Sequence, residues 1–180
     1  MKGKLRNLSF ALALLAFTAP AFLRADTGTG TKNDLSAKVR HQILSQPYYT
    51  IFDTLGYKVD GGTVTLYGEV TWPVLKTDVE HAVKKIEGVE KVVDNIKVLP
   101  LSPMDNGIRR AEYRAIFGFG PLYRYAIGAN PSIHIIVDNG HVTLVGFVDN
   151  EADKNMAYVR ANGVPGVFSV TNDLQVAGRG

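Results

Sequence analysis

The chain of 180 residues contains no cysteine. This absence excludes disulfide bonds, thiolate catalysis and thiolate metal sites, and also the acylated cysteine that tethers bacterial lipoproteins. The nucleophile-elbow, zinc-protease, P-loop and dinucleotide-binding motifs are missing too. Four histidines are present, and their spacing does not suit a shared metal ion. We therefore expect a protein that is not an enzyme and that uses no metal and no cofactor.

Long apolar runs are also absent after the first 25 residues. Residues 1–25 combine a cationic start, "MKGKLRN", with the apolar run "LSFALALLAFTAPAF" and small residues near Ala21 and Ala25. Pro20 and Arg24 make this run shorter than the roughly 20 apolar residues that cross a bilayer. The pattern is typical of a cleaved export signal, so we expect a periplasmic or secreted protein that is not a lipoprotein.

The chain has little net charge once this leader is removed. Residues 1–25 contain four of the 20 basic residues and none of the 17 acidic ones, which leaves 16 against 17. The sequence pI of about 9.1 is therefore mostly a property of the leader. Global charge gives no support for nucleic-acid binding.

An internal repeat dominates the rest of the sequence. A shift of 78 residues aligns 61–98 with 139–176 without a gap, and 11 of these 38 positions are identical. Both copies contain a glycine turn, "VTL", a second glycine and a valine. Most identical positions are apolar residues or glycines, so a shared architecture explains them best.

Each copy predicts the element order αββαβ. Asp34 is a predicted N-cap of the first helix, and Asp105 or Asn106 has that role in the second copy. Two-residue turns are expected at Gly61-Gly62 and Asn139-Gly140, because these residues tolerate positive φ. Thr71 and Asp149 are the predicted N-caps of the next helices. The expected fold class is α+β, with two tandem modules that each place two helices on one face of a three-stranded sheet.

Domain boundaries follow from this order. We expect a signal peptide at 1–25, a flexible segment at 26–33, a first domain at 34–99, a linker at 100–106, a second domain at 107–177 and a tail at 178–180.

Period-two alternation predicts which residues face the core. The apolar positions on this face are Leu55, Tyr57, Val59, Val64, Leu66 and Val70, matched by Ile133, Ile135, Val137, Val142, Leu144 and Val148. Four glycines are assigned structural roles. Gly68 and Gly146 are expected to let a helix approach the sheet closely, and Gly88 and Gly166 to end helices in a left-handed conformation.

The opposite face of the second sheet is unusually apolar, with His134, Ile136, Val145 and Phe147. An apolar face of this kind is unfavourable in water. We expect it to contact the first module or a second molecule.

These motifs resemble the BON domain of exported bacterial proteins. The resemblance is carried by "VTLYGEV…GVEKVVDNIKV" and "VTLVGFVDN…GVPGVFSVTNDLQV" and covers nearly all of the chain after the leader. The paired arrangement is similar to an osmotically inducible periplasmic member and to a dual-domain outer-membrane lipoprotein of that family. The resemblance implies non-enzymatic attachment to phospholipid surfaces in envelope integrity or stress response, or a chaperone-like role.

One segment differs between the copies. Residues 108–125, "IRRAEYRAIFGFGPLYRY", contain four arginines against one acid, several aromatic rings and about five extra residues around "GFGPL". Inserted loops on repeats often carry function. We predict that this segment binds anionic phospholipid, with basic residues facing phosphate and rings at the acyl boundary. The candidate lipid-binding residues are Arg109, Arg110, Tyr113, Arg114, Phe117, Phe119, Tyr123 and Arg124.

Other interpretations of this segment stay open. Its rings could instead fill a crevice between the domains, leaving the arginines as a solvated rim. A chaperone that holds unfolded envelope proteins would use apolar surfaces without needing arginines. An accessory module of an envelope complex is the third alternative.

Overall fold

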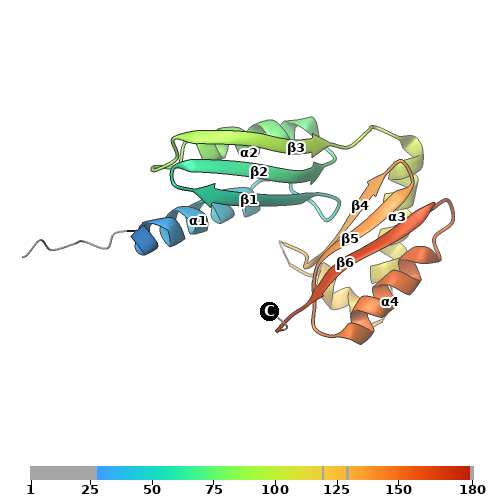
Figure 1. Cartoon of the computed structure of the whole chain (residues 1–180). Coiled ribbons are helices and arrows are strands. Elements are labelled where there is room, and N and C mark those ends of the chain that lie inside the picture. Colours follow the sequence, from blue (N-terminus) through green and yellow to red (C-terminus); the bar gives the residue numbers. More distant parts are fainter. Residues whose placement is uncertain (1–27, 119, 129, 179–180) are drawn as a thin grey trace, which may run out of the picture.

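Two three-stranded sheets organise the chain in the computed structural model, which describes residues 28–118, 120–128 and 130–178. Module one contains α1 (Gly28–Leu44), β1 (Thr54–Asp60), β2 (Thr63–Val70), α2 (Pro73–Lys84) and β3 (Lys91–Val98). Module two contains α3 (Pro103–Phe117), the 3₁₀ helix η1 (Pro121–Ala126), β4 (Ile133–Asp138), β5 (His141–Val148), α4 (Glu151–Asn162) and β6 (Ser169–Val176). The predicted α+β class with two αββαβ modules is confirmed (Figure 1).

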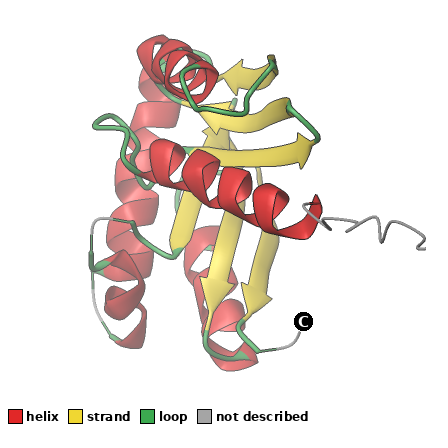
Figure 2. Cartoon of the chain, turned by 90° about the vertical axis from the view of Figure 1, so that its left-hand side faces the viewer, coloured by secondary structure: helices red, strands yellow, loops and turns green. Residues whose placement is uncertain are grey.

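The two sheets have the same topology and register. In each, the first two strands form an antiparallel hairpin, and the third strand pairs in parallel with the second strand. In each module, the helix between the second and third strands makes the crossover connection that a parallel pair of strands requires. Helices and strands lie in separate layers, and the strands of the two sheets run in different directions (Figure 2). The two sheets do not merge.

The predicted core faces are correct. In module two all six alternating residues from Ile133 to Val148 are buried. In module one Val64, Leu66 and Val70 are buried, whereas the β1 residues Leu55 and Tyr57 are only partly covered. Strand β1 is therefore less well enclosed than its counterpart β4.

Gly68 and Gly146 are structural, but not for the predicted reason. A Cβ on Gly68 would lie 2.1 Å from the carbonyl oxygen of Thr54, and one on Gly146 would lie 2.0 Å from that of Ser132. Their φ angles are +126° and +122°. The close neighbour is thus the backbone at the start of the adjacent strand, not a helix.

Several predicted helix ends are wrong. Helix α1 begins at Gly28, inside the segment 26–33 predicted to be flexible, so Asp34 lies within the helix and pairs with Lys38 at 2.7 Å. The N-cap of α3 is Ser102, whose hydroxyl accepts from the Asp105 amide, and α3 therefore starts inside the predicted linker 100–106.

The remaining caps differ by one to three residues. The N-caps of α2 and α4 are Trp72 and Asn150, one residue after Thr71 and Asp149. Gly88 and Gly166 have the predicted positive φ, but each lies three residues after the C-cap of its helix. They shape the turns into β3 and β6 instead of capping α2 and α4.

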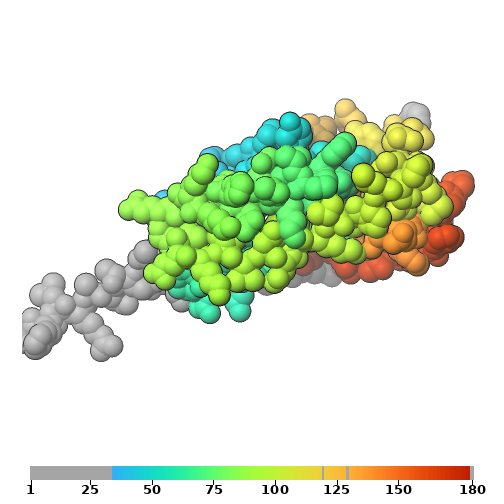
Figure 3. Space-filling model, turned by 90° about the horizontal axis from the view of Figure 1, so that it is seen from above, coloured from blue at the N-terminus to red at the C-terminus, as the bar shows by residue number. Residues whose placement is uncertain are grey.

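The modules are joined by more than their linker. Ile51, from the segment between α1 and β1, is buried in the core of module two, and its carbonyl accepts a 2.8 Å hydrogen bond from the amide of Ile135 on β4. Lys97 of β3 forms an ion pair with Asp138 of β4 at 2.6 Å. In the space-filling view, the linker and the start of α3 lie against module one (Figure 3).

Candidate functional site

Helix α3 presents a basic and aromatic face to solvent. Arg110 and Arg114 are exposed, and the Tyr113 side chain between them is 41% exposed. The described part of the chain contains no ion pair to either arginine. Two guanidinium groups are therefore free to meet an anion from outside.

Module one contributes to the same surface. A cavity of about 290 Å³ is lined by Arg110, Tyr113 and Arg114 together with Ile51 and Phe52. A second hollow, of about 230 Å³, shares Phe52 and Arg110 and extends to Trp72 and Leu101. Six residues from both modules thus form what we call the junction surface: Phe52, Trp72, Leu101, Arg110, Tyr113 and Arg114.

A buried carboxylate holds the module-one part of this surface in place. Asp53 is fully buried and accepts four hydrogen bonds of 2.6 to 2.9 Å, from the amides and hydroxyls of Thr50 and Thr71. Charge-assisted bonds of this kind are roughly twice as strong as neutral ones. Asp53 therefore fixes the turn that carries Ile51 into module two and leaves Phe52 beside Arg110.

The surface carries a positive charge and large apolar groups. None of the described residues that line either hollow is an Asp or a Glu. Trp72 is 56% exposed and Leu101 is 80% exposed. Guanidinium groups suit phosphate or carboxylate partners, and aromatic rings favour the interface of a bilayer.

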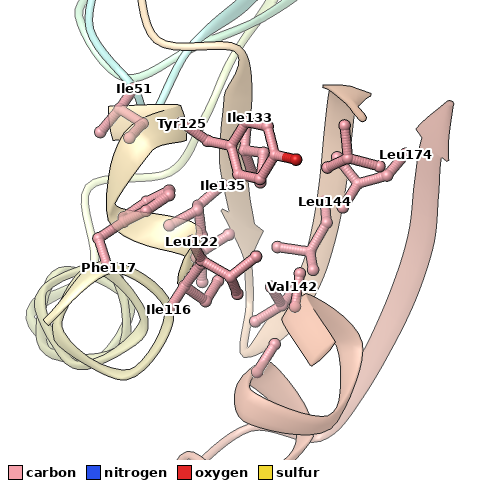
Figure 4. Close-up of a cluster of buried hydrophobic side chains, with 14 of the residues drawn as sticks. Ile51, Ile116, Phe117, Leu122, Tyr125, Ile133, Ile135, Val142, Leu144 and Leu174 are labelled. Atoms are coloured by element: carbon pink, nitrogen blue, oxygen red, sulfur yellow. The ribbon is translucent and has the colours of Figure 1, made fainter. Parts of the chain in front are cut away.

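Two of the predicted lipid-binding residues point inward. Arg109 is 5% exposed and donates to the backbone oxygen of Val137 and to the Asn106 side chain. Phe117 is 1% exposed and belongs to the core of module two, where Figure 4 shows it beside Ile116 and Leu122. Phe117 is enclosed in the core, and Arg109 reaches only the wall of the second hollow, so neither side chain is exposed as predicted.

The other predicted residues fall outside the junction surface. Phe119 lies outside the described residues. Tyr123 is exposed but lines neither hollow. Arg124 forms ion pairs with Asp149 and Asp153, and its guanidinium lies 4.6 Å from the centre of the Tyr125 ring. These acids compensate the charge of Arg124.

Sequence reasoning missed Phe52, Trp72 and Leu101. They come from two loops of module one and from the linker, so no single stretch of sequence brings them together. Trp72 is the N-cap of α2, and its side chain is largely exposed. One available signal was "PLSP", which places an apolar residue in a short link where little can cover it.

The apolar outer face of the second sheet is partly covered. Ile136 is 2% exposed, and the His134 ring stacks on Tyr49 of module one with a centroid distance of 5.4 Å. Burial lowers the pKa of His134. Phe147 stays 56% exposed at the edge of a groove between α1 and β1.

Helix α3 also contains a buried acid. Glu112 is fully buried, and neither of its carboxylate oxygens has a hydrogen-bond partner. Burial raises its pKa to about 8 from an ordinary value of 4.5, because the apolar core disfavours the charged form. Glu112 is therefore neutral at pH 7 and cannot balance the charge of the arginines on the opposite side of the helix.

The profile of the BON domain matches two segments of the sequence, residues 31–100 and 124–178. Together they cover more than half of the chain. The chain belongs to the BON domain family. BON domains are non-catalytic binding domains, and the family is associated in general with phospholipid binding and envelope stress. The second match starts after α3, so the helix that carries the arginines lies outside it.

Comparison with solved structures finds CdsD, described as a structural protein of the type III secretion system of Chlamydia trachomatis. One structure is 15% identical, covers 81% of this chain and 94% of its own, and has a TM-score of 0.30. Its C-terminal domain is 14% identical, with 79% and 97% coverage and a TM-score of 0.31. No curated protein matches the sequence.

Two further properties concern the described residues alone. Among them, no helix has the length and apolar character needed to traverse a bilayer. No three His, Asp or Glu side chains in residues 28–118, 120–128 and 130–178 gather closely enough to hold a metal ion.

Proposed function

We propose that the protein binds anionic phospholipid surfaces in the cell envelope, reversibly and without catalysis, through the junction surface. The observation that carries this proposal is the pairing of two uncompensated arginines with exposed rings from both modules. The export signal predicted in residues 1–25 agrees with an envelope location, and a role in envelope or osmotic stress follows as part of the proposal.

The energies support reversible binding. A basic residue close to an anionic bilayer contributes about 1 kcal/mol, so Arg110 and Arg114 together provide about 2 kcal/mol. Trp72 and Phe52 add affinity by entering the headgroup region with their apolar area. Neither contribution alone gives firm attachment, and their combination makes binding depend on both lipid charge and ring insertion.

The test uses module one as a guide to the substitutions. Helices α1 and α3 are aligned on Leu35 and Ile108, because these two residues lie next to the equivalent glycines Gly88 and Gly166. Arg110 and Arg114 then correspond to Ala37 and His41. The double variant R110A/R114H therefore copies residues that the fold already accepts in α1.

Flotation with phosphatidylglycerol vesicles should show about thirtyfold weaker binding of R110A/R114H. The control K58A/K85A removes two exposed cations elsewhere in module one and should change binding by less than about threefold. Equal loss in both double variants would indicate general charge attraction, and undiminished binding of R110A/R114H would refute the proposal.

A second candidate function is the holding of unfolded envelope proteins. It is favoured by exposed apolar side chains far from the arginines in sequence, since Val159 and Phe168 are each 68% exposed. Salt separates the two candidates, because lipid docking weakens as ionic strength rises and apolar client binding does not. Binding that is unchanged between low salt and 0.5 M salt would favour the chaperone-like role.

A further inference from the structure

A groove lies between α1 and β1 of module one. Its volume is about 730 Å³, and it is lined by four residues of α1, four of β1, Tyr67 of β2 and Phe147 of β5. We call it the open groove. It is a different site from the junction surface, since the two share no lining residue.

The equivalent space in module two is filled by the protein itself. The core next to α3 and β4 contains Ile51 from module one and Leu122 and Tyr125 from η1 (Figure 4). Module one has no counterpart of η1 between α1 and β1. The same fold thus encloses apolar side chains in one copy and leaves an accessible hollow in the other.

The lining of the open groove is suited to an aliphatic chain. Ile43, Leu44, Leu55 and Val59 line it, and Phe147 closes it from module two. Ligand pockets of this size are typically apolar, with a few polar groups that fix orientation. The hydroxyl groups of Ser36 and Tyr57 lie 3.0 Å apart on its wall.

The groove carries one cation and no acid. Arg40 lines it, and no Asp or Glu is among the described lining residues. Arg40 is exposed and has no ion pair within the described part of the chain. A guanidinium next to an apolar hollow selects an occupant with an anionic end and an aliphatic body.

An added peptide strand fits this place less well. The ring of Tyr67 covers Gly56, where a Cβ would lie 2.2 Å from it, and the Tyr67 hydroxyl donates to the backbone oxygen of Tyr57. These contacts occupy backbone positions of β1 that a new strand would need.

We propose that the open groove binds the acyl chain of a free fatty acid, with its carboxylate at Arg40 and its chain between α1 and β1 toward Phe147. This site is independent of the phospholipid surface proposed above. Its occupant is a single-chain anionic amphiphile, not a bilayer.

The probe is laurate, used below its critical micelle concentration. Dodecyltrimethylammonium, which has the same chain length and the opposite charge, is the comparison ligand. Calorimetry on the purified protein should show binding of laurate and about tenfold weaker binding of the cation. Amide NMR shifts on laurate addition should centre on Gly56 and Tyr57.

Two surface variants keep the test independent of folding. R40Q should weaken laurate about tenfold and abolish the preference for the anion, and F147S should weaken both amphiphiles by a similar factor. R114Q serves as the control, because it lies on the junction surface and should leave laurate binding unchanged. Laurate binding that survives both R40Q and F147S, or shifts confined to α3, would overturn the proposal.

Discussion

The two modules have identical strand registers but different first helices. Leu55 pairs with Gly68 in module one as Ile133 pairs with Gly146 in module two, and the third strands follow in the same register. On the first helices, however, the buried Val39 corresponds to Glu112, and Ser36 corresponds to Arg109. The duplicated hairpins serve as the framework, and the specialised residues lie on α3 and the segments around it.

The contact between modules is likewise asymmetric. Module one inserts Ile51 into module two, and module two covers its own α3–β4 space with η1. Module one receives only the half-exposed Phe147 at the edge of the open groove between α1 and β1. The repeat therefore contains one module that is completed by the other and one that remains accessible.

Replacing Glu112 by the residue of module one should have the largest effect. The folded pKa of about 8 lies above the ordinary value of 4.5, so the folded state keeps a proton that the unfolded state releases. The stability associated with this proton is complete below pH 4.5 and is lost as the pH rises through 8, a change of up to about 5 kcal/mol. E112V removes this dependence.

Urea unfolding should therefore show that E112V stabilises the protein more at pH 9 than at pH 5. The reciprocal variant V39E buries an acid in the core of module one and should destabilise that module increasingly above pH 5. An equal effect of E112V at both pH values would show that Glu112 is not a buried neutral acid.

The matched glycines should respond alike. G68A and G146A each force a Cβ against the backbone of the neighbouring strand at positive φ, and each should cost about 3 kcal/mol. Thermal unfolding measures both. G61A provides the comparison, because its positive φ is not accompanied by any contact within 4 Å, and its cost should be about 1 kcal/mol. A harmless G146A would contradict the common framework.

Truncating the inter-module contact should have a somewhat smaller effect. I51A removes a buried side chain from the core of module two and should cost about 2 to 3 kcal/mol, although Ile51 belongs to module one in sequence. I127A, at a 60% exposed position, should change stability by less than about 0.5 kcal/mol. Denaturant midpoints that are unchanged in I51A would mean that the modules do not share a core.

The framework was predictable because the repeat and the period-two alternation of apolar residues reflect directly which side chains are buried. The αββαβ order, both turns and the core faces all follow from period-two patterns and paired glycines. Helix ends were less accurate, since Asp34 and Asp105 have capping side chains but lie inside their helices.

The candidate site was only partly predictable. Arg110, Tyr113 and Arg114 are on the surface, as predicted, but Arg109 and Phe117 were predicted to lie there too. Their burial depends on where β4 and η1 pack in the tertiary structure, which the local sequence pattern does not reveal. Phe52, Trp72 and Leu101 join the site only because Ile51 and Asp53 fix the two modules against each other.

Trp72 provides the most direct test of the junction surface, because it is the single tryptophan of the chain and its ring is 56% exposed there. Its fluorescence should shift to shorter wavelength on addition of phosphatidylglycerol vesicles, remain unchanged with phosphatidylcholine, and be quenched by brominated acyl chains in the anionic vesicles. Vesicle binding with an unchanged Trp72 spectrum and no quenching would contradict the account.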